Sequence, residues 1–204
     1  MDYYTERKVW CFWADIKNMN EKRKKCFEVL KKTSEVNIEL GTCENYLDFQ
    51  NSKNPIHKAF THLSDTHKSD YMRCYLLHNY GGGYADIKPY SFSWNGYFDL
   101  LNDDIDLIGA QEICEDHIAV PELRNNYKKL ISCGHFILKK NSIISQEWMN
   151  EVNTILDKNF ENLTKNPGTY HPRAVKKSQD PTGVFQPDSP KIYETNYCLG
   201  WNEI

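Results

Sequence analysis

The chain has 204 residues, of which 40% are hydrophobic and 13% aromatic, enough for one domain with a substantial core. Its 25 basic and 28 acidic residues give a formal charge of -3, so we expect no nucleic acid partner and no general attraction to anionic lipid. No apolar run approaches the roughly 18 residues of a membrane span, and the first residues lack a signal-peptide core. We therefore expect a cytoplasmic protein without a membrane span, formed by a single domain over residues 1–204 or by one domain of a longer multidomain enzyme.

Two further features of composition have simple interpretations. The seven cysteines are scattered and include no C-x-x-C pair, which favours reduced thiols over a disulfide framework or a zinc site. The basic run Lys22–Lys25 lies in a predicted helix beside Glu21 and Glu28, so we interpret it as a solvated helix face.

The first elements predict an α/β fold. Residues 8–14 are short, aromatic and β-branched, which is typical of a buried strand. Asn20 can cap a helix that runs to about Thr33, and the alternating residues 36–40 predict a second strand. This β-α-β order indicates parallel strands.

The rest of the chain continues the alternation of helices and strands. Residues 42–65 are polar and irregular, and the helix expected over 67–80 stops at the triple glycine Gly81–Gly83, as at a C-cap. Further strands are expected over residues 84–87, 107–110 and 135–138, a long helix over 143–160, and extended pieces at 184–186 and 191–193, in a tail that forms a lid or an edge of the sheet.

Asp70 and Arg73 are the first candidates for a binding site. They are three residues apart in the predicted helix, so their side chains emerge on one face. Arginine offers a fork of donors suited to phosphate oxygens, and aspartate accepts hydrogen bonds from hydroxyls. The pair therefore suits a ligand that is part sugar and part phosphate, although an exposed intrahelical ion pair explains the same spacing.

Asp86 extends this candidate site. It lies at the carboxyl end of the strand that follows the glycine turn, where open α/β sheets bind ligands. A carboxylate there can bind a ribose hydroxyl, or a divalent cation that neutralises a pyrophosphate.

The segment Ser69-Asp-Tyr-Met-Arg73, followed by Tyr80-Gly-Gly-Gly-Tyr-Ala-Asp-Ile-Lys88, resembles the S-D-x-x-R … Y-G-G-x-Y-x-D-x-D signature of the DXD-containing sugar transferases. That superfamily includes capsular-polysaccharide and mannosyl transferases and the glucosylating clostridial toxins. The first strand, with its terminal Trp13, is similar to the opening strand of the family. The resemblance implies a GT-A (Rossmann-like) fold, a single α/β domain around a mostly parallel mixed sheet flanked by helices.

The resemblance also implies roles for individual residues. Trp13 would stack on the donor base, usually uracil, Asp70 would bind sugar hydroxyls, and Arg73 would reach the sugar or the phosphate. Asp86 would hold the ribose and the metal region, and Asp70, Arg73 and Asp86 would form the catalytic group. The donor-binding residues implied as a set are Trp13, Ala14, Ser69, Asp70, Arg73, Tyr84, Ala85, Asp86 and Lys88.

Lys88 departs from the signature, which has a second Asp at that position. A protonated lysine cannot ligate a cation, but its ammonium can neutralise a diphosphate. Either Mn²⁺ or Mg²⁺ still binds through Asp86, or Lys88 partly replaces the ion. Of these two, we favour metal binding at Asp86.

An inverting enzyme would also need a base for the acceptor hydroxyl. Candidates follow the predicted strand 107–110, where a solvated acidic loop is the alternative interpretation, and His135 begins a later strand where relatives bind the acceptor or donor sugar. His171 and residues 201–203 near the C-terminus are candidates for closing over the diphosphate. The acidic-loop candidates are Glu112, Glu115, Asp116 and His117.

The sequence thus predicts a glycosyltransferase that moves a hexose or deoxyhexose from a nucleotide sugar, most simply a UDP-sugar, to a glycan acceptor. Two alternatives remain open. One is a nucleotide-sugar hydrolase or nucleotidyltransferase on the same scaffold. The other is a noncatalytic module that binds a nucleotide sugar or a glycan.

Overall fold

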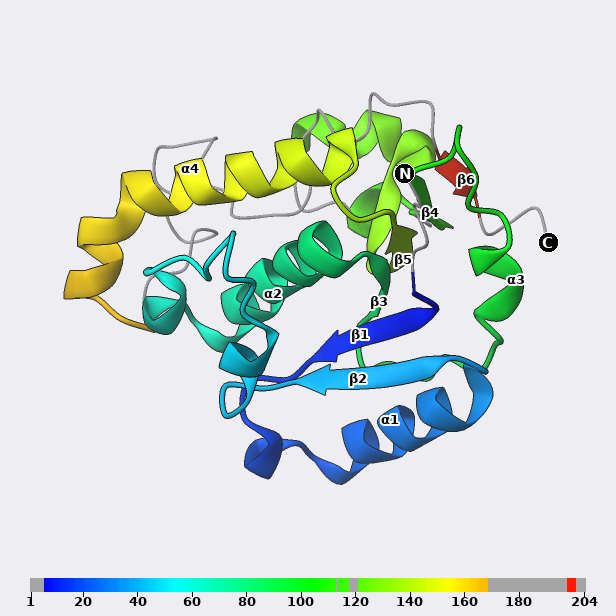
Figure 1. Cartoon of the computed structure of the whole chain (residues 1–204), viewed down its shortest axis with the longest axis horizontal. Helices are drawn as coiled ribbons and strands as arrows, with labels where there is room; N and C mark the ends of the chain where they lie inside the picture. Colours follow the sequence, from blue (N-terminus) through cyan, green and yellow to red (C-terminus); the bar gives the residue numbers. More distant parts are fainter. Residues whose placement is uncertain (1–5, 113, 118–120, 169–197, 201–204) are drawn as a thin grey trace.

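The structure is a computed structural model that describes residues 6–112, 114–117, 121–168 and 198–200. Within these ranges six strands form one mixed sheet, with helices on both faces (Figure 1). Helix α1 covers one face, and helices α2 and α4 lie together on the other. The predicted α/β class with a mixed sheet between helices is confirmed.

The strands are arranged in the order β2-β1-β3-β5-β4-β6. Strand β1 pairs in parallel with β2 on one side and with β3 on the other, whereas β5 runs antiparallel to both β3 and β4. Strand β6 pairs in parallel with β4. The strands are β1 (Lys8–Phe12), β2 (Asn37–Gly41), β3 (Gly82–Ala85), β4 (Leu107–Gln111), β5 (Ile131–Leu138) and β6 (Cys198–Gly200).

Polar side chains cap the three long helices at their N-termini. Asn20 accepts a hydrogen bond from the backbone of Arg23, and Ser64 and Ser142 do the same for α2 and α4. The α-helices are α1 (Glu21–Thr33), α2 (Asp65–Tyr80), the short α3 (Asn95–Phe98) and α4 (Ile143–Lys165). Short 3₁₀ helices are η1 (Ile16–Asn18), η2 (Tyr46–Phe49), η3 (Phe60–His62), η4 (Glu115–His117) and η5 (Pro121–Lys129). No helix in the described ranges is both long enough and apolar enough to cross a membrane.

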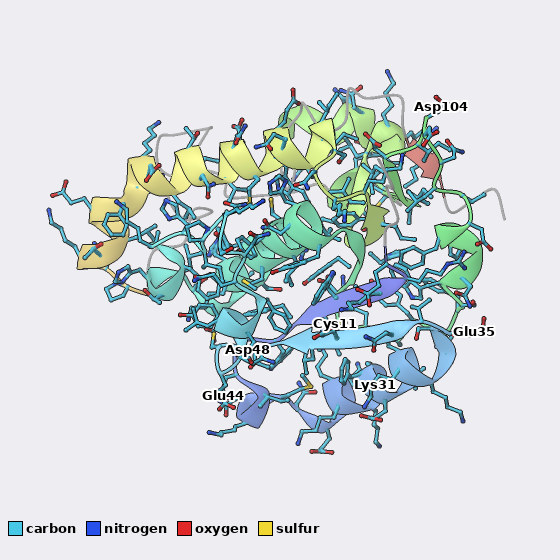
Figure 2. The ribbon with its side chains drawn as sticks, viewed as in Figure 1. Cys11, Lys31, Glu35, Glu44, Asp48 and Asp104 are labelled. Carbon is cyan, nitrogen blue, oxygen red and sulfur yellow. The ribbon has the colours of Figure 1, made fainter. Side chains whose placement is uncertain are left out.

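The alternation of side chains along the strands divides the core into two layers. From β1, Trp10 and Phe12 pack toward α2 and α4, whereas Val9 and Cys11 pack toward α1. Figure 2 labels Cys11 on β1, which is fully buried, and Lys31 on α1, which is exposed. Both faces of β1 are therefore buried, which explains its uninterrupted apolar sequence.

Several boundaries differ from the sequence-based expectations. Strand β3 was expected over residues 84–87 but spans 82–85, because two of the glycines belong to the strand and only Gly81 caps α2. Strand β5 begins at Ile131, ahead of the expected residue 135, and α4 extends to Lys165. Strand β6 was not expected. The pieces expected at 184–186 and 191–193 lie outside the described residues.

Gly82 gives a test of why glycine occupies the start of β3. Its φ is +97°, and an added Cβ would lie 2.6 Å from the carbonyl oxygen of Lys8. We expect Gly82→Ala to lower the free energy of unfolding by about 2–4 kcal/mol, because backbone strain and a backbone clash act together. Urea unfolding measures the change.

Gly96 in α3 is the matched control, since a Cβ there meets nothing within 4 Å. Gly96→Ala should leave stability unchanged or raise it by up to about 1 kcal/mol. Equal effects of the two substitutions would contradict this account of Gly82.

Candidate functional site

A pocket of about 490 Å³ opens at the carboxyl ends of β1 and β3. This volume is within the range of small-molecule sites, about 300–1,000 Å³. Its lining comes from four regions of the chain: the end of β1 with η1, the start of α1, the first half of α2, and the segment after β3 with its neighbour on β5. The lining residues are Phe12, Trp13, Ala14, Asp15, Asn18, Arg23, Asp65, Thr66, Ser69, Asp70, Arg73, Asp86, Ile87, Lys88 and Cys133.

The strand order explains the position of the pocket. The chain leaves β1 through α1 to reach β2 on one side, and then passes through α2 to reach β3 on the other side of β1. The connections therefore diverge at the carboxyl ends of β1 and β3. Such a topological switch point is where open α/β sheets form a ligand crevice.

Helix α2 contributes Asp70 and Arg73, which form an ion pair 3.4 Å long between Arg73 Nη2 and Asp70 Oδ1. The side chain of Arg73 is only 6% exposed and that of Asp70 16% exposed. The alternative of an exposed intrahelical ion pair is therefore wrong, because Arg73 is buried. The same Nη2 also lies 3.2 Å from Oδ1 of Asp86, so one guanidinium joins the helix to the end of β3.

The remaining donors of Arg73 lack partners. Within the described residues, neither Nε nor Nη1 has a hydrogen-bond acceptor, although both atoms are buried. The guanidinium carbon lies 4.5 Å from the ring centroid of Tyr84, a cation–π contact. Buried donors without acceptors are costly, more so on a charged group. An anion bound in the pocket would give these donors acceptors.

Tyr84 contacts Ser69 as well as Arg73. Its hydroxyl lies 3.0 Å from Ser69 Oγ, and its side chain is fully buried. Burial raises the pKa of Tyr84 well above its usual range, so the phenol stays neutral and can share a hydrogen bond with the serine. Tyr84 and the equally buried Ala85 do not line the pocket, so neither is exposed to a ligand there.

The segment after β3 is fixed by backbone hydrogen bonds. The N–H of Asp86 donates to the carbonyl of Gly134 on β5, at 2.7 Å, and the N–H of Lys88 donates to the carbonyl of Asp86, at 2.8 Å. The two side chains then meet, with Lys88 Nζ 2.9 Å from Asp86 Oδ2. The Asp86 carboxylate therefore lies between two cations, Arg73 and Lys88.

His135 lies next to this segment but not in the pocket lining. It pairs with Ala85 across the sheet, and its ring centroid is 4.8 Å from that of Tyr90. Burial, with the positive charge of Lys88, lowers the pKa of His135 to about 4. The ring is therefore neutral at physiological pH and a weak proton acceptor.

The other candidate bases lie elsewhere. Glu112 follows β4, and its backbone N–H donates to the carbonyl of Leu130; Glu115 and Asp116 are exposed on η4. None of these three lines the pocket. His117 also belongs to η4, but its side chain lies outside what the structure describes, as do His171 and residues 201–203.

The structure thus brings most of the predicted donor-site residues to one pocket from three separate segments. Those that line it are Trp13, Ala14, Ser69, Asp70, Arg73, Asp86 and Lys88.

Other lining residues were not predicted as site residues. Arg23 belongs to the basic run interpreted as solvated, yet it is partly buried and its Nη1 donates to the carbonyl of Ile87 at 2.5 Å. That interpretation is wrong for Arg23, because its guanidinium contacts the backbone just after β3 and lines the pocket. Cys133 reaches the pocket from β5, and no local sequence signal distinguishes it from the other cysteines.

Comparison with known proteins agrees with this arrangement. Residues 2–91 match a protein-family model described as capsular polysaccharide synthesis protein. Every residue that lines the pocket lies in this range except Cys133. Among solved structures, the chain is similar to the PaToxG glycosyltransferase, with a TM-score of 0.51 and 16% sequence identity. The match covers 80% of this chain and 66% of that one, so this chain spans less than the whole of its neighbour.

A search of curated proteins finds no significant match. At 16% identity the structural likeness establishes the fold. Together with the family match, it confirms the predicted relation to glycosyltransferases of the GT-A type.

Cys133 provides a reporter for occupation of the pocket. It is partly exposed and lines the pocket, so a bound nucleoside diphosphate would cover it. We expect UDP at about 100 times its dissociation constant to slow maleimide modification of Cys133 by about 100-fold, because only the free protein reacts. Peptide mass spectrometry over time measures the rate.

Cys43 is the internal control, since it is also partly exposed but does not line the pocket. Its rate should not respond to UDP. Equal rates for Cys133 with and without UDP would show that the nucleotide does not occupy this pocket.

Proposed function

We propose that this protein is a glycosyltransferase that moves a hexose or deoxyhexose from a nucleotide sugar, with UDP as the nucleotide, to a glycan acceptor. One observation carries the proposal: the side chains of Trp13 and Asp70 and three cationic side chains line a single pocket at the switch point of the sheet. These are the groups needed for a base, a sugar and a diphosphate. The relation to glycosyltransferases supports the same conclusion.

Trp13 provides the surface for the nucleotide base. It is partly buried and directly follows β1. Its backbone N–H donates to the carbonyl of Gly41 at 2.9 Å, which fixes the backbone from which the ring extends. A large aromatic face stacks on a base, and the backbone next to it, at Ala14, can select the base through its edge. Trp13 is thus the proposed base platform.

The cations provide the diphosphate site. Among the described residues, two buried donor atoms of Arg73 have no acceptor. Arg23 is held by the carbonyl of Ile87, and Lys88 by the carboxylate of Asp86. Guanidinium and ammonium groups stabilise phosphate oxygens through charge-assisted hydrogen bonds. Asp70, on the same side of α2 as Arg73, is placed to accept hydrogen bonds from the hydroxyls of the transferred sugar.

The proposed reaction breaks the bond between the anomeric carbon and the phosphate oxygen. The electron pair leaves with the diphosphate, where Arg73, Arg23 and Lys88 neutralise the developing charge. The acceptor hydroxyl forms the new bond to the anomeric carbon and loses its proton. Neither His135 nor the carboxylates Glu112 and Asp116 line the pocket, so the group that takes this proton stays a prediction.

Two other functions use the same pocket. A nucleotide-sugar hydrolase would pass the sugar to water, and a noncatalytic module would bind the nucleotide sugar without releasing its sugar. A panel of UDP- and GDP-sugars, tested with and without glycan acceptors, separates the three. Sugar incorporated into a glycan indicates transfer, free sugar alone indicates hydrolysis, and binding without product indicates the module.

Asp70 tests the division of the pocket into a nucleotide part and a sugar part. Wild-type protein should gain about 5–10 °C in melting temperature with UDP at about 100 times its dissociation constant. Asp70→Asn should keep this UDP shift but reduce the turnover of the UDP-sugar by about 10–100-fold, because it loses a charge-assisted hydrogen bond to the sugar. Thermal unfolding and sugar release measure the two effects.

Asp104→Asn is the matched control, because Asp104 is exposed far from the pocket and is labelled at the surface in Figure 2. It should change neither quantity. The absence of a melting shift with any nucleotide in the wild-type protein would contradict the proposed function.

A further inference from the structure

The Asp86 carboxylate is the group at which the resemblance places a divalent cation, and both of its oxygens already face positive side chains. Oδ1 accepts a hydrogen bond from Arg73 Nη2 at 3.2 Å, and Oδ2 lies 2.9 Å from Lys88 Nζ. Two cations therefore share one carboxylate at the edge of the pocket.

This arrangement does not fit Mn²⁺ or Mg²⁺. At nucleotide sites such ions are held by one or two carboxylates together with substrate phosphates and waters, so a carboxylate oxygen must be open to the ion. In the part of the chain that the structure describes, no three side chains of His, Cys, Asp or Glu gather in a way that could hold a metal ion. An ion at either oxygen of Asp86 would also lie against the ammonium of Lys88 or the guanidinium of Arg73.

We propose that Lys88 takes the place of the divalent cation, so that the protein binds the diphosphate of its nucleotide sugar without a metal ion. This inference rests on the proposed function, because it concerns how the same pocket handles phosphate charge. An ammonium can neutralise phosphate oxygens as a compact point charge.

The backbone places Lys88 for this role. Its N–H donates to the carbonyl of Asp86, and the N–H of Tyr90 donates to the carbonyl of Lys88, both at 2.8 Å, so the turn around Lys88 is fixed. The side chain is 47% exposed and lines the pocket, so it can move from Asp86 to a bound phosphate.

Gly134 provides the space next to this pair. An added Cβ there would make tight contacts with the Tyr90 hydroxyl at 3.2 Å and Lys88 Nζ at 3.3 Å, and an ordinary contact with Asp86 Oδ2 at 3.5 Å. Its carbonyl also accepts the hydrogen bond from the Asp86 N–H at 2.7 Å. A residue without a side chain on β5 therefore leaves the ammonium room beside the carboxylate.

The other acids of the pocket have partners of their own. Asp15 caps η1, with Oδ1 accepting from the backbone of Lys17 and Oδ2 from the side chain of Asn18. Asp65 pairs with Lys68 at 3.4 Å. When Lys88 turns to a phosphate, Arg73 remains beside both Asp70 and Asp86, so neither carboxylate is left without a cation.

The test is UDP binding measured by calorimetry in two buffers, one with EDTA and one with Mn²⁺. Wild-type protein should bind UDP with dissociation constants that agree within about twofold in the two buffers. Lys88→Met should weaken binding in EDTA by about 10–100-fold, as expected for a lost charge-assisted contact. Lys88→Asp should lose binding in EDTA and regain it in Mn²⁺, because a second carboxylate beside Asp86 supplies a metal ligand.

Lys158→Met is the matched control, since Lys158 is exposed on α4 and does not line the pocket; it should bind UDP as wild type does. Circular dichroism and thermal unfolding verify that each variant folds. Wild-type binding that strengthens more than about tenfold with Mn²⁺, or a folded Lys88→Met variant that binds normally in EDTA, would overturn the proposed role of Lys88 but not the proposed function. No UDP binding in either buffer would overturn the proposed function as well.

Discussion

The buried guanidinium of Arg73 is the group on which the architecture of the pocket depends. Removing a charge of this kind from water costs several kcal/mol unless partners compensate it. Asp70 from the same helix and Asp86 from the end of β3 provide that compensation, and the ring of Tyr84 adds a cation–π contact. One side chain thereby links α2 to the segment that follows β3.

Arg73 is a charged side chain on a helix that is otherwise packed into the apolar core. Helix α2 buries Tyr71, Met72 and Cys74 on either side of Arg73, so it is fixed against the sheet. Arg73 nevertheless keeps two donors without acceptors in the described residues. Such a cost at the switch point of the sheet supports the proposal that an anion binds there.

The parts of this site that follow from local geometry could be predicted from the sequence. The spacing of Asp70 and Arg73 places both on one helix face, and the glycine turn puts Asp86 at a strand end, so short-range rules were sufficient. The cap at Asn20 and the β-α-β opening follow from equally local signals. Trp13 and Ser69 required the family resemblance, because an aromatic residue or a serine alone has many possible uses.

The parts that depend on distant pairing could not be predicted in the same way. Strand β5 runs antiparallel between β3 and β4, and this non-local arrangement brings Cys133 to the pocket and the carbonyl of Gly134 to the backbone of Asp86. Arg23 appeared to be one of several surface cations, because the sequence does not show that its side chain reaches the carbonyl of Ile87. The contact between Lys88 and Asp86 also depends on a folded turn, so the sequence alone left its role open.

The central claim is that this pocket binds a nucleotide sugar, and a crystal structure of the protein with UDP tests it most directly. We expect the uracil to stack on Trp13 and the diphosphate to lie between Arg73 and Lys88, with at least one phosphate oxygen accepting from the free donors of Arg73. A UDP molecule bound elsewhere, with the donors of Arg73 still without acceptors, would contradict the claim.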